Sequence, residues 1–304
     1  MTNRVHVLLA TYNGVEYLGE QLRSIESQSL PVARVTIRDD GSTDGTLSFL
    51  QEWANGRPSI RLLHGQQLGA TNNFFELLAN PDQDFDFFAF SDQDDVWLVN
   101  KLENAVSTLG SQSAEEPLMY CSRLEYVDQG LGHLGYSTIP RQLDFANALV
   151  ENVVTGCTVV LNRCARDLIV ARLPKTVLFH DWWCYLVVSA VGKVVYDPRP
   201  NIKYRQHANN HVGGTSSVLE LFRRRLARFL RGNQGVNLLS SQALEFERCF
   251  GDLLTPRQRR VLARFLTVRG NLWTRLSYNR AMDVWRQSRI DTAILRTLIL
   301  LGRV

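Results

Sequence analysis

The first hundred residues alternate short apolar, β-branched runs with stretches of helical periodicity. The runs at 5–10, 35–38, 60–63 and 85–90 predict buried strands. The intervening stretches predict helices over 16–28, over the segment that ends near Trp53, and over 70–79. This order is typical of βαβ units on a parallel sheet.

The alternation weakens after residue 100. Residues 118–126, 158–161 and 193–196 predict further strands, and residues 163–171 and 181–190 predict helices. From Val218 onward helical patterns dominate. We therefore predict an α/β domain over residues 1–215, with a mixed and mainly parallel sheet, and a helical C-terminal region over 216–304.

Charge divides the chain at the same place. The net charge of the 304 residues is only +4, but residues 216–304 hold 17 Arg, no Lys and six acidic residues, a net of +11. The first 215 residues hold 17 basic and 24 acidic side chains, a net of −7. The two regions therefore call for separate explanations.

The cysteine pattern and the absence of long apolar runs indicate the cellular compartment of the protein. Its five cysteines include no CxxC pair, which favours a reducing compartment over a disulfide framework. The first residues lack the apolar core of a signal peptide, and no apolar run is long enough to span a bilayer. We expect a cytoplasmic protein that does not cross a membrane.

Residues 218–231 predict an amphipathic helix with Phe222, Leu226, Phe229 and Leu230 on one face and arginines on most of the other. Such a helix could lie on the anionic inner face of the cytoplasmic membrane. It could equally pack on the acidic first 215 residues. No recognition motif accompanies the arginines, so nucleic acid is not an expected partner.

Polar residues follow three of the predicted strands, at 11–13, 39–40 and 92–95. In an open α/β sheet, ligands bind outside the carboxyl ends of the strands. Neither a GxGxxG turn nor a GxxxxGK[ST] loop is present, which disfavours NAD-dependent enzymes and P-loop NTPases.

Asp92, Asp94 and Asp95 would repel one another unless a cation balances them. Their hard oxygen ligands suit Mg²⁺ or Mn²⁺, ions that proteins often share with substrate phosphates. The alternative is a solvated acidic turn.

Six short motifs occur in an order that resembles family 2 glycosyltransferases, and more narrowly bacterial rhamnosyltransferases of lipopolysaccharide and other surface polysaccharides. They are VLLATYNG (7–14), RDDGSTDGT (38–46), LGATNNF (68–74), SDQDDVW (91–97), FHDWW (179–183) and YRQHANN (204–210). The resemblance covers residues 5–212 and implies a GT-A fold, a Rossmann-like arrangement of sheet and helices.

The resemblance also implies roles on the donor side. Thr11 and Tyr12 would line the nucleotide pocket, and Asp39 would hydrogen-bond the pyrimidine base. Gly69 would let the backbone approach the nucleotide, and Asn73 would shape the same wall.

Asp92 and Asp94 correspond to the Asp-X-Asp pair of the family, which holds the ribose and the metal. His207 corresponds to a late histidine that contacts the metal or the diphosphate, and Asp181 to the carboxylate that deprotonates the acceptor.

Other readings remain for several of these residues. Asp181 could instead cap a helix. Trp182 and Trp183 are candidate acceptor contacts, although most tryptophans belong to cores or interfaces. Asp40 and Asp44 are explained as turn and cap residues. Residues 156–158 could form part of the acceptor pocket or a tight strand entry.

Together these residues predict a metal-dependent transferase that inverts the anomeric centre, because a base would act on the side opposite the leaving group. The favoured donor is dTDP-rhamnose, and the favoured acceptor is a glycan or glycolipid. The alternatives are a transferase of the same family that uses a UDP-sugar, and a non-catalytic glycan- or nucleotide-binding module.

Overall fold

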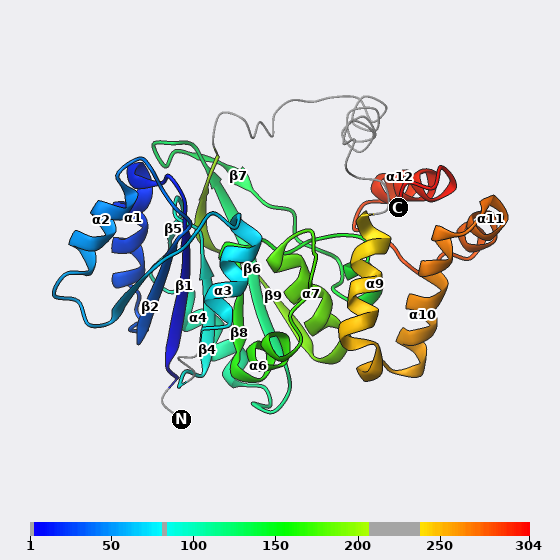
Figure 1. Ribbon diagram of the computed structural model, residues 1–304, viewed down its shortest axis with the longest axis horizontal. Helices are drawn as coiled ribbons and strands as arrows, with labels where there is room; N and C mark the ends of the chain where they lie inside the picture. The colour runs from blue at the N-terminus through cyan, green and yellow to red at the C-terminus, as the bar shows by residue number, and fades with distance from the viewer. Residues whose placement is uncertain (1–2, 81–83, 207–237) are drawn as a thin grey trace.

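The computed structural model describes residues 3–80, 84–206 and 238–304. Its central sheet is flanked by helices, with a group of C-terminal helices at one end (Figure 1). The strands are β1 (Val5–Thr11), β2 (Arg34–Asp39), β3 (Ile60–His64), β4 (Phe87–Ser91), β5 (Val96–Trp97), β6 (Leu118–Val127), β7 (His133–Tyr136), β8 (Val160–Asn162) and β9 (Lys193–Arg205).

The helices of the first two thirds of the chain are α1 (Val15–Glu26), α2 (Thr46–Ala54), α3 (Ala70–Leu78), α4 (Lys101–Gly110), α5 (Phe145–Ala148), α6 (Arg163–Ala171) and α7 (His180–Val191). A short 3₁₀ turn, η1, spans Gly156–Thr158. The C-terminal group comprises α9 (Leu238–Phe250), α10 (Pro256–Leu266), α11 (Leu272–Arg280) and α12 (Arg289–Leu300).

The described strands form one sheet in the order β3-β2-β1-β4-β8-β6-β9-β5, with β7 paired to β6. Strands β1 to β4 are parallel. Strand β8 is antiparallel to both β4 and β6, and β9 is parallel to β6, so six strands point the same way. The prediction of a mixed, mainly parallel sheet is thus confirmed. Because β1 lies between β2 and β4, the chain reverses its winding there, which is where such sheets bind ligands.

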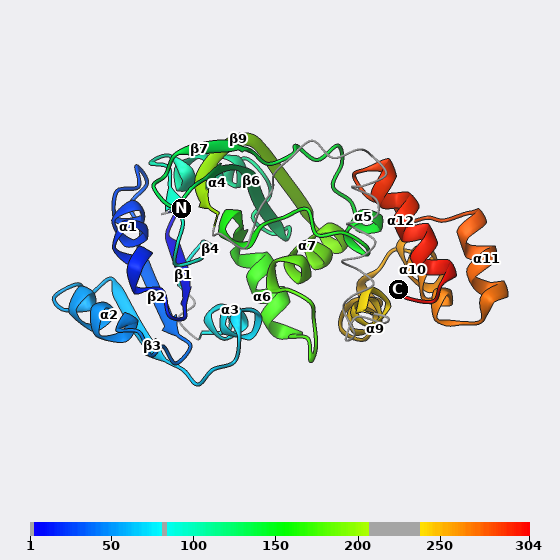
Figure 2. The same cartoon turned by 90° about the horizontal axis from the view of Figure 1, so that it is seen from above.

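The two faces of the sheet are covered by different helices, as the view from above shows (Figure 2). Successive side chains of a strand point to opposite faces, so Val7 and Leu9 pack with α1, α2 and α4, whereas Leu8 packs with α3, α6 and α7. Both faces are apolar, which explains why these strands appear as continuous apolar runs in the sequence.

The C-terminal helices extend the core on the α7 side of the sheet. The rings of Phe246 and Phe250 in α9 lie 6.1 and 6.0 Å from the indole of Trp183 in α7. Helix α10 begins with a capping box in which Thr255 and Gln258 bond reciprocally, with Pro256 in the first turn. The predicted boundary at 215/216 and the predicted helix 218–231 lie outside the described residues.

Two strand predictions differ from the structure. Strand β9 continues to Arg205, beyond the predicted 193–196, and its pairing with β6 shifts register near Pro200. The predicted strand at 158–161 is instead the turn η1 followed by β8. None of the helices in the described part of the chain is long and apolar enough to cross a membrane.

Candidate active site

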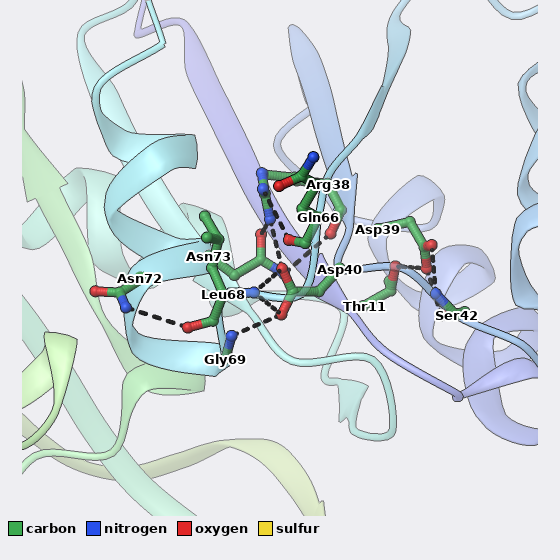
Figure 3. A network of polar contacts seen from close by, with 10 residues as sticks. All are labelled: Thr11, Arg38, Asp39, Asp40, Ser42, Gln66, Leu68, Gly69, Asn72 and Asn73. Atoms are coloured by element: carbon green, nitrogen blue, oxygen red, sulfur yellow. Dashed lines mark hydrogen bonds and ion pairs between the residues drawn. The ribbon is translucent and has the colours of Figure 1, made fainter.

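The loops after β1 and β2 meet around the carboxylate of Asp39. This carboxylate accepts hydrogen bonds from the Thr11 hydroxyl at 3.0 Å and from the Ser42 backbone N–H at 2.9 Å (Figure 3). Asp39 and Thr11 are both buried. The geometry therefore fixes the Asp39 carboxylate at the carboxyl end of β2, within the predicted nucleotide side of the site.

A second network lies beside it and holds the turn before α3. The Asp40 carboxylate pairs with the Arg38 guanidinium at 2.7 Å and accepts hydrogen bonds from the backbone N–H groups of Leu68 and Gly69. Gly69 has a φ of +80°, a conformation that a side chain would strain, and it directly precedes α3 (Figure 3). Asp40 therefore fixes a backbone turn, consistent with the predicted turn role.

Asn73 supports the same network from behind. Its side-chain oxygen accepts a hydrogen bond from the Arg38 guanidinium at 3.0 Å, and its Nδ2 donates to the Arg38 carbonyl at 3.2 Å. Because Asn73 is buried, it shapes this wall through Arg38. Sequence reasoning missed the role of Arg38, because its partner Asn73 lies 35 residues further along the chain.

Gln93, the middle residue of the Asp-X-Asp motif, joins the loop after β4 to the loop after β1. The Tyr12 backbone N–H donates to Gln93 Oε1 at 2.8 Å, and Gln93 Nε2 donates to the Tyr12 carbonyl at 3.0 Å. A Cβ at Gly14 would overlap the Gln93 amide in this position, so a larger residue there would displace the amide from Tyr12. The Tyr12 side chain is 42% exposed and remains available for contact with a ligand.

Three carboxylates gather after β4. Oxygens of Asp92 and Asp95 and the sulfur of Cys157 lie within 4.8 Å of one another. Burial and the charges of Asp94 and Asp181 raise the pKa of Asp92 to about 7. Burial and the charges of Asp92 and Asp94 raise the pKa of Asp95 well above its usual range. These raised pKa values indicate that the positive charge nearby does not balance the carboxylates.

A buried cation, Lys101, lies at the start of α4, and its charge acts on Asp92. Its ammonium lies 3.3 Å from the centroid of the Trp97 ring and has no hydrogen-bond partner among the described residues. Burial lowers the pKa of Lys101 to about 7, while the charges of Cys157, Asp95 and Asp92 oppose that shift. Lys101 alone cannot neutralise three carboxylates, and the buried Arg205 at the end of β9 pairs with Glu20, so the donor set fits a divalent cation.

Arg205, at the end of β9, holds the acidic loop in place. Its Nε donates to the Asp94 carbonyl at 2.9 Å, and its guanidinium pairs with Glu20 of α1 at 2.5 Å. The Arg205 side chain is buried, so the end of β9 is fixed beside the loop that follows β4. His207 lies outside the described residues.

Asp181 lies in the first turn of α7 and is 9% exposed. Burial raises its pKa to about 6, although hydrogen bonds from Trp182, Gly156 and Asn152 oppose the shift. Asn152 Nδ2 donates to Asp181 Oδ1 at 3.1 Å. The charge of Asp181 also contributes to raising the pKa of Asp92, so the two carboxylates are close enough to interact. A carboxylate with a pKa near neutrality is suited to accept a proton.

His180, next to Asp181, is packed between aromatic rings. It stacks on Phe74 at 3.9 Å and meets Phe90 edge-on at 5.2 Å. Burial lowers its pKa to about 3, so the ring is neutral at physiological pH. A Cβ at Gly156 would lie 2.7 Å from His180 Nε2, which explains the glycine in η1.

The two tryptophans differ from the expectation of acceptor contacts. Trp183 is fully buried against α9, and Trp182 is 7% exposed, with its Nε1 donating to the Ala148 carbonyl at 2.7 Å. Neither presents a flat face on which a sugar could stack. Their physical role is to join α7 to α5 and to the C-terminal helices.

The open α/β sheet with buried carboxylates at its switch point is Rossmann-like, and sheets of this kind bind ligands outside the carboxyl ends of their strands. Residues 6–155 match the family model described as glycosyl transferase family 2. The dTDP-rhamnosyl transferase RfbG of Shigella flexneri is 32% identical over 229 residues, covering 71% of this chain and 77% of that protein. The chain therefore belongs to glycosyltransferase family 2 and is a glycosyltransferase.

Solved structures confirm the fold. TarS 1–349 of S. aureus in complex with UDP-GlcNAc superposes with a TM-score of 0.53 at 15% identity, covering 99% of this chain and 92% of that one. The mannosyltransferase PcManGT of Pyrobaculum calidifontis, in complex with GDP-Man and Mn²⁺, gives 0.50 at 18% identity, covering 99% and 85%. These neighbours are GT-A glycosyltransferases, so the predicted fold class is confirmed.

Proposed function

We propose that the enzyme transfers rhamnose from dTDP-rhamnose to a hydroxyl group of a glycan acceptor in lipopolysaccharide or another surface polysaccharide. The observation that carries this proposal is the buried carboxylate of Asp181 at the start of α7, which accepts a hydrogen bond from Asn152 at 3.1 Å and whose charge acts on Asp92. The similarity to a dTDP-rhamnosyl transferase supports the choice of donor.

On the donor side, the loops after β1 and β2 bind the nucleotide. Asp39, held by Thr11 and Ser42, accepts a hydrogen bond from the pyrimidine, and the exposed ring of Tyr12 contacts the nucleoside. Gly69 presents bare backbone at the start of α3, where a side chain would limit approach. Hydrogen bonds hold the ends of β1 and β2 and the turn before α3 in place, so the pocket needs little ordering on binding.

The diphosphate leaves only if its developing negative charge is met. Asp92 and Asp94 are the proposed ligands of a Mg²⁺ or Mn²⁺ ion, which when bound would supply that charge. Asp95 is buried, and one of its oxygens lies within 4.8 Å of an Asp92 oxygen. The neighbour bound to GDP-Man and Mn²⁺ supports use of a divalent cation. His207 is a further proposed ligand.

On the acceptor side, Asp181 removes the proton from the attacking hydroxyl. Its pKa of about 6 leaves most of the carboxylate ionised at neutral pH yet basic enough to accept a proton. Asn152 orients the carboxylate. The acceptor oxygen attacks the anomeric carbon from the face opposite the diphosphate, which inverts its configuration.

A second donor class has support of its own. The Escherichia coli β-1,3-glucosyltransferase WfgD, named for UDP-Glc as donor, is 27% identical over 164 residues, covering 52% of this chain and 60% of that protein. A UDP-sugar would use the same Asp39 contact, because both nucleotides carry a pyrimidine.

The first experiment is calorimetric titration with dTDP, UDP, GDP and NAD, each with Mn²⁺, with Mg²⁺ or with EDTA, followed by turnover of dTDP-rhamnose. Metal-dependent binding of dTDP and transfer of rhamnose are the expected results. Preference for UDP would favour the second donor class. Binding of none of these nucleotides would reject the transferase and favour the non-catalytic module.

The cation proposal has a matched pair of variants. Asp94→Ala is expected to abolish the dependence of dTDP affinity on Mn²⁺, whereas Asp84→Ala, whose side chain is 82% exposed, is expected to leave it unchanged. Equal affinity of Asp94→Ala with Mn²⁺ and with EDTA is the supporting result. A full Mn²⁺ effect in Asp94→Ala would remove this residue from the cation site.

We also propose that residues 218–231 associate the enzyme peripherally with the inner face of the cytoplasmic membrane. The support is the run of arginines beside an apolar face in this segment. Flotation with anionic liposomes compares the full chain with a variant in which Phe222 and Phe229 are replaced by Ser. Equal recovery of the two proteins would reject the proposal.

A further inference from the structure

A cleft of about 580 Å³ opens between the catalytic sheet and the C-terminal helices. Residues of β6, the segment after β7, the loop 151–155 and the segment 287–291 line it. This volume is within the range of roughly 300 to 1,000 Å³ that is typical of small-ligand sites.

The cleft is connected to the proposed base. Asn152 lines the cleft and also donates its side-chain hydrogen bond to Asp181 at 3.1 Å. The nucleotide loops follow β1, β2 and β4, whereas the cleft is built on β6 and β9, beyond β8 in the sheet. A ligand in the cleft would therefore approach Asp181 from the side away from the nucleotide.

The lining combines ring faces with polar groups. Tyr126 and Tyr196 supply aromatic surface. The polar groups are the Asn152 amide, which also bonds Asp181 and the Val154 N–H, the Ser288 hydroxyl, which also caps α12, and the Asp291 carboxylate. Aromatic faces pack on the C–H faces of sugars, while the polar groups hydrogen-bond their hydroxyls. This mixture suits a carbohydrate.

The charges in the cleft argue against a phosphate-bearing ligand. Among the residues that line it, Arg141 is the one basic side chain, and it is outnumbered by Glu151 and Asp291. The charges of Glu151 and Asp291 also act on Arg286, which is buried and does not line the cleft, so a phosphate would meet two lining carboxylates and one lining arginine. An uncharged glycan fits both the aromatic and polar lining of the cleft and the charges of its side chains.

The wall formed by the C-terminal region is fixed in place. Gln287 Nε2 donates to the Gln142 carbonyl at 2.7 Å, the Arg141 backbone N–H donates to Gln287 Oε1 at 2.8 Å, and the Gln287 backbone N–H donates to Glu151 at 2.6 Å. These bonds join the segment before α12 to the loop before α5. The cleft is thus preformed, which lowers the entropic cost of binding.

We propose that this cleft binds the inner sugars of an uncharged oligosaccharide acceptor while its terminal sugar reaches Asp181. This inference rests on the proposed function and adds a subsite to which the C-terminal helical region contributes. It predicts that acceptors of three sugars are used better than single sugars, because only the longer ones reach the cleft.

The test uses octyl glycosides of one, two and three sugars with rhamnosyl, glucosyl or N-acetylglucosaminyl termini. Tyr126→Ala removes a stacking face, and Thr138→Trp adds bulk at the edge of the cleft. Tyr136→Ala is the matched control, because Tyr136 is 47% exposed on the neighbouring strand β7 and does not line the cleft.

For the trisaccharide, both cleft variants are expected to raise KM at least about tenfold, the equivalent of one lost contact of about 1.4 kcal/mol. For the monosaccharide, KM is expected to be unchanged. Release of dTDP by hydrolysis of the donor in the absence of acceptor is expected to be unchanged in every variant, which also shows that each variant is folded.

Equal KM values for the trisaccharide in wild type, cleft variants and control would overturn the placement of the glycan. Failure of the wild type both to use these glycosides and to bind them by saturation-transfer NMR would overturn the ligand class. Glycan binding without any turnover of dTDP-rhamnose would instead reject the proposed donor and leave the cleft assignment standing.

Discussion

Replacing Asp181 by Asn is expected to abolish transfer and at the same time to stabilise the protein. The substitution removes the proton acceptor while keeping the size of the side chain and an oxygen that can still accept the hydrogen bond from Asn152. Loss of a general base typically lowers turnover by a factor of about 10² to 10⁴. Donor affinity is expected to stay close to that of the wild type.

The gain in stability follows from the pKa of Asp181. Burial raises this pKa from 3.8 to about 6 in the folded state. The folded protein therefore binds more protons than the unfolded chain between these pH values, so the free energy of unfolding falls as the pH rises through that interval. Above pH 6 the ionised carboxylate lowers the free energy of unfolding by up to about 3 kcal/mol, at 1.36 kcal/mol per pKa unit. An asparagine side chain is uncharged, so it does not lower the free energy of unfolding in this way.

Thermal unfolding of both proteins at pH 7.5 and pH 4 measures this difference. We expect Asp181→Asn to unfold at a higher temperature at pH 7.5, by about 2 °C per kcal/mol, and the difference to shrink at pH 4. Asp84→Asn, at a site 82% exposed, is the control and is expected to change little.

Two results would refute the reasoning. Asp181→Asn with no gain in stability at pH 7.5 would show that the carboxylate is better solvated or hydrogen-bonded than its burial indicates. Transfer at near wild-type rate would show that another group accepts the proton. An enzyme that keeps a destabilising charged group at its centre illustrates how function can oppose stability.

Three further variants test the support of the site. Gln93→Leu removes both hydrogen bonds to Tyr12 and is expected to weaken dTDP binding about tenfold by calorimetry, at 1.4 kcal/mol per factor of ten; unchanged affinity would contradict a positioning role. Lys101→Met removes the buried ammonium, so the pKa of Asp92 should rise further and Mn²⁺-dependent dTDP binding should require higher pH. An unaltered pH profile of dTDP binding would contradict this electrostatic role of Lys101. Trp183→Ala is expected to cost about 3 to 5 kcal/mol in urea unfolding, because the side chain is fully buried; a loss below 1 kcal/mol would contradict its place in the core.

The first half of the fold could be predicted from the sequence because its strands are buried on both faces. Strands such as β1 and β4 stand out as apolar runs, and the polar residues that end them mark the ligand-binding edge. Strand β9 could not be predicted in full, because Pro198 and Pro200 interrupt the pattern and proline is rare inside strands. Its irregular pairing with β6 accommodates them.

The candidate site residues could be predicted because they follow the strands in the sequence. The residues that hold them in place could not, because those contacts join distant parts of the chain. Gln93 bonds to Tyr12, 81 residues earlier in the chain, and no local pattern indicates that contact. The burial of Trp183 depends on α9, which follows much later. A tryptophan in a core and one that stacks on a sugar look alike in a sequence.

The alternation of side chains along β2 explains why neighbouring carboxylates differ in role. Arg38 and Asp40 are two residues apart, point to the same side and meet Asn73 of α3. Asp39 lies between them and points to the opposite side, where it meets Thr11 and Ser42. One carboxylate therefore fixes the backbone before α3, while the other is left for a ligand. A shift of one residue in the register of β2 would exchange these roles, so the pairing of β2 with β1 sets the chemistry of the pocket as well as the sheet.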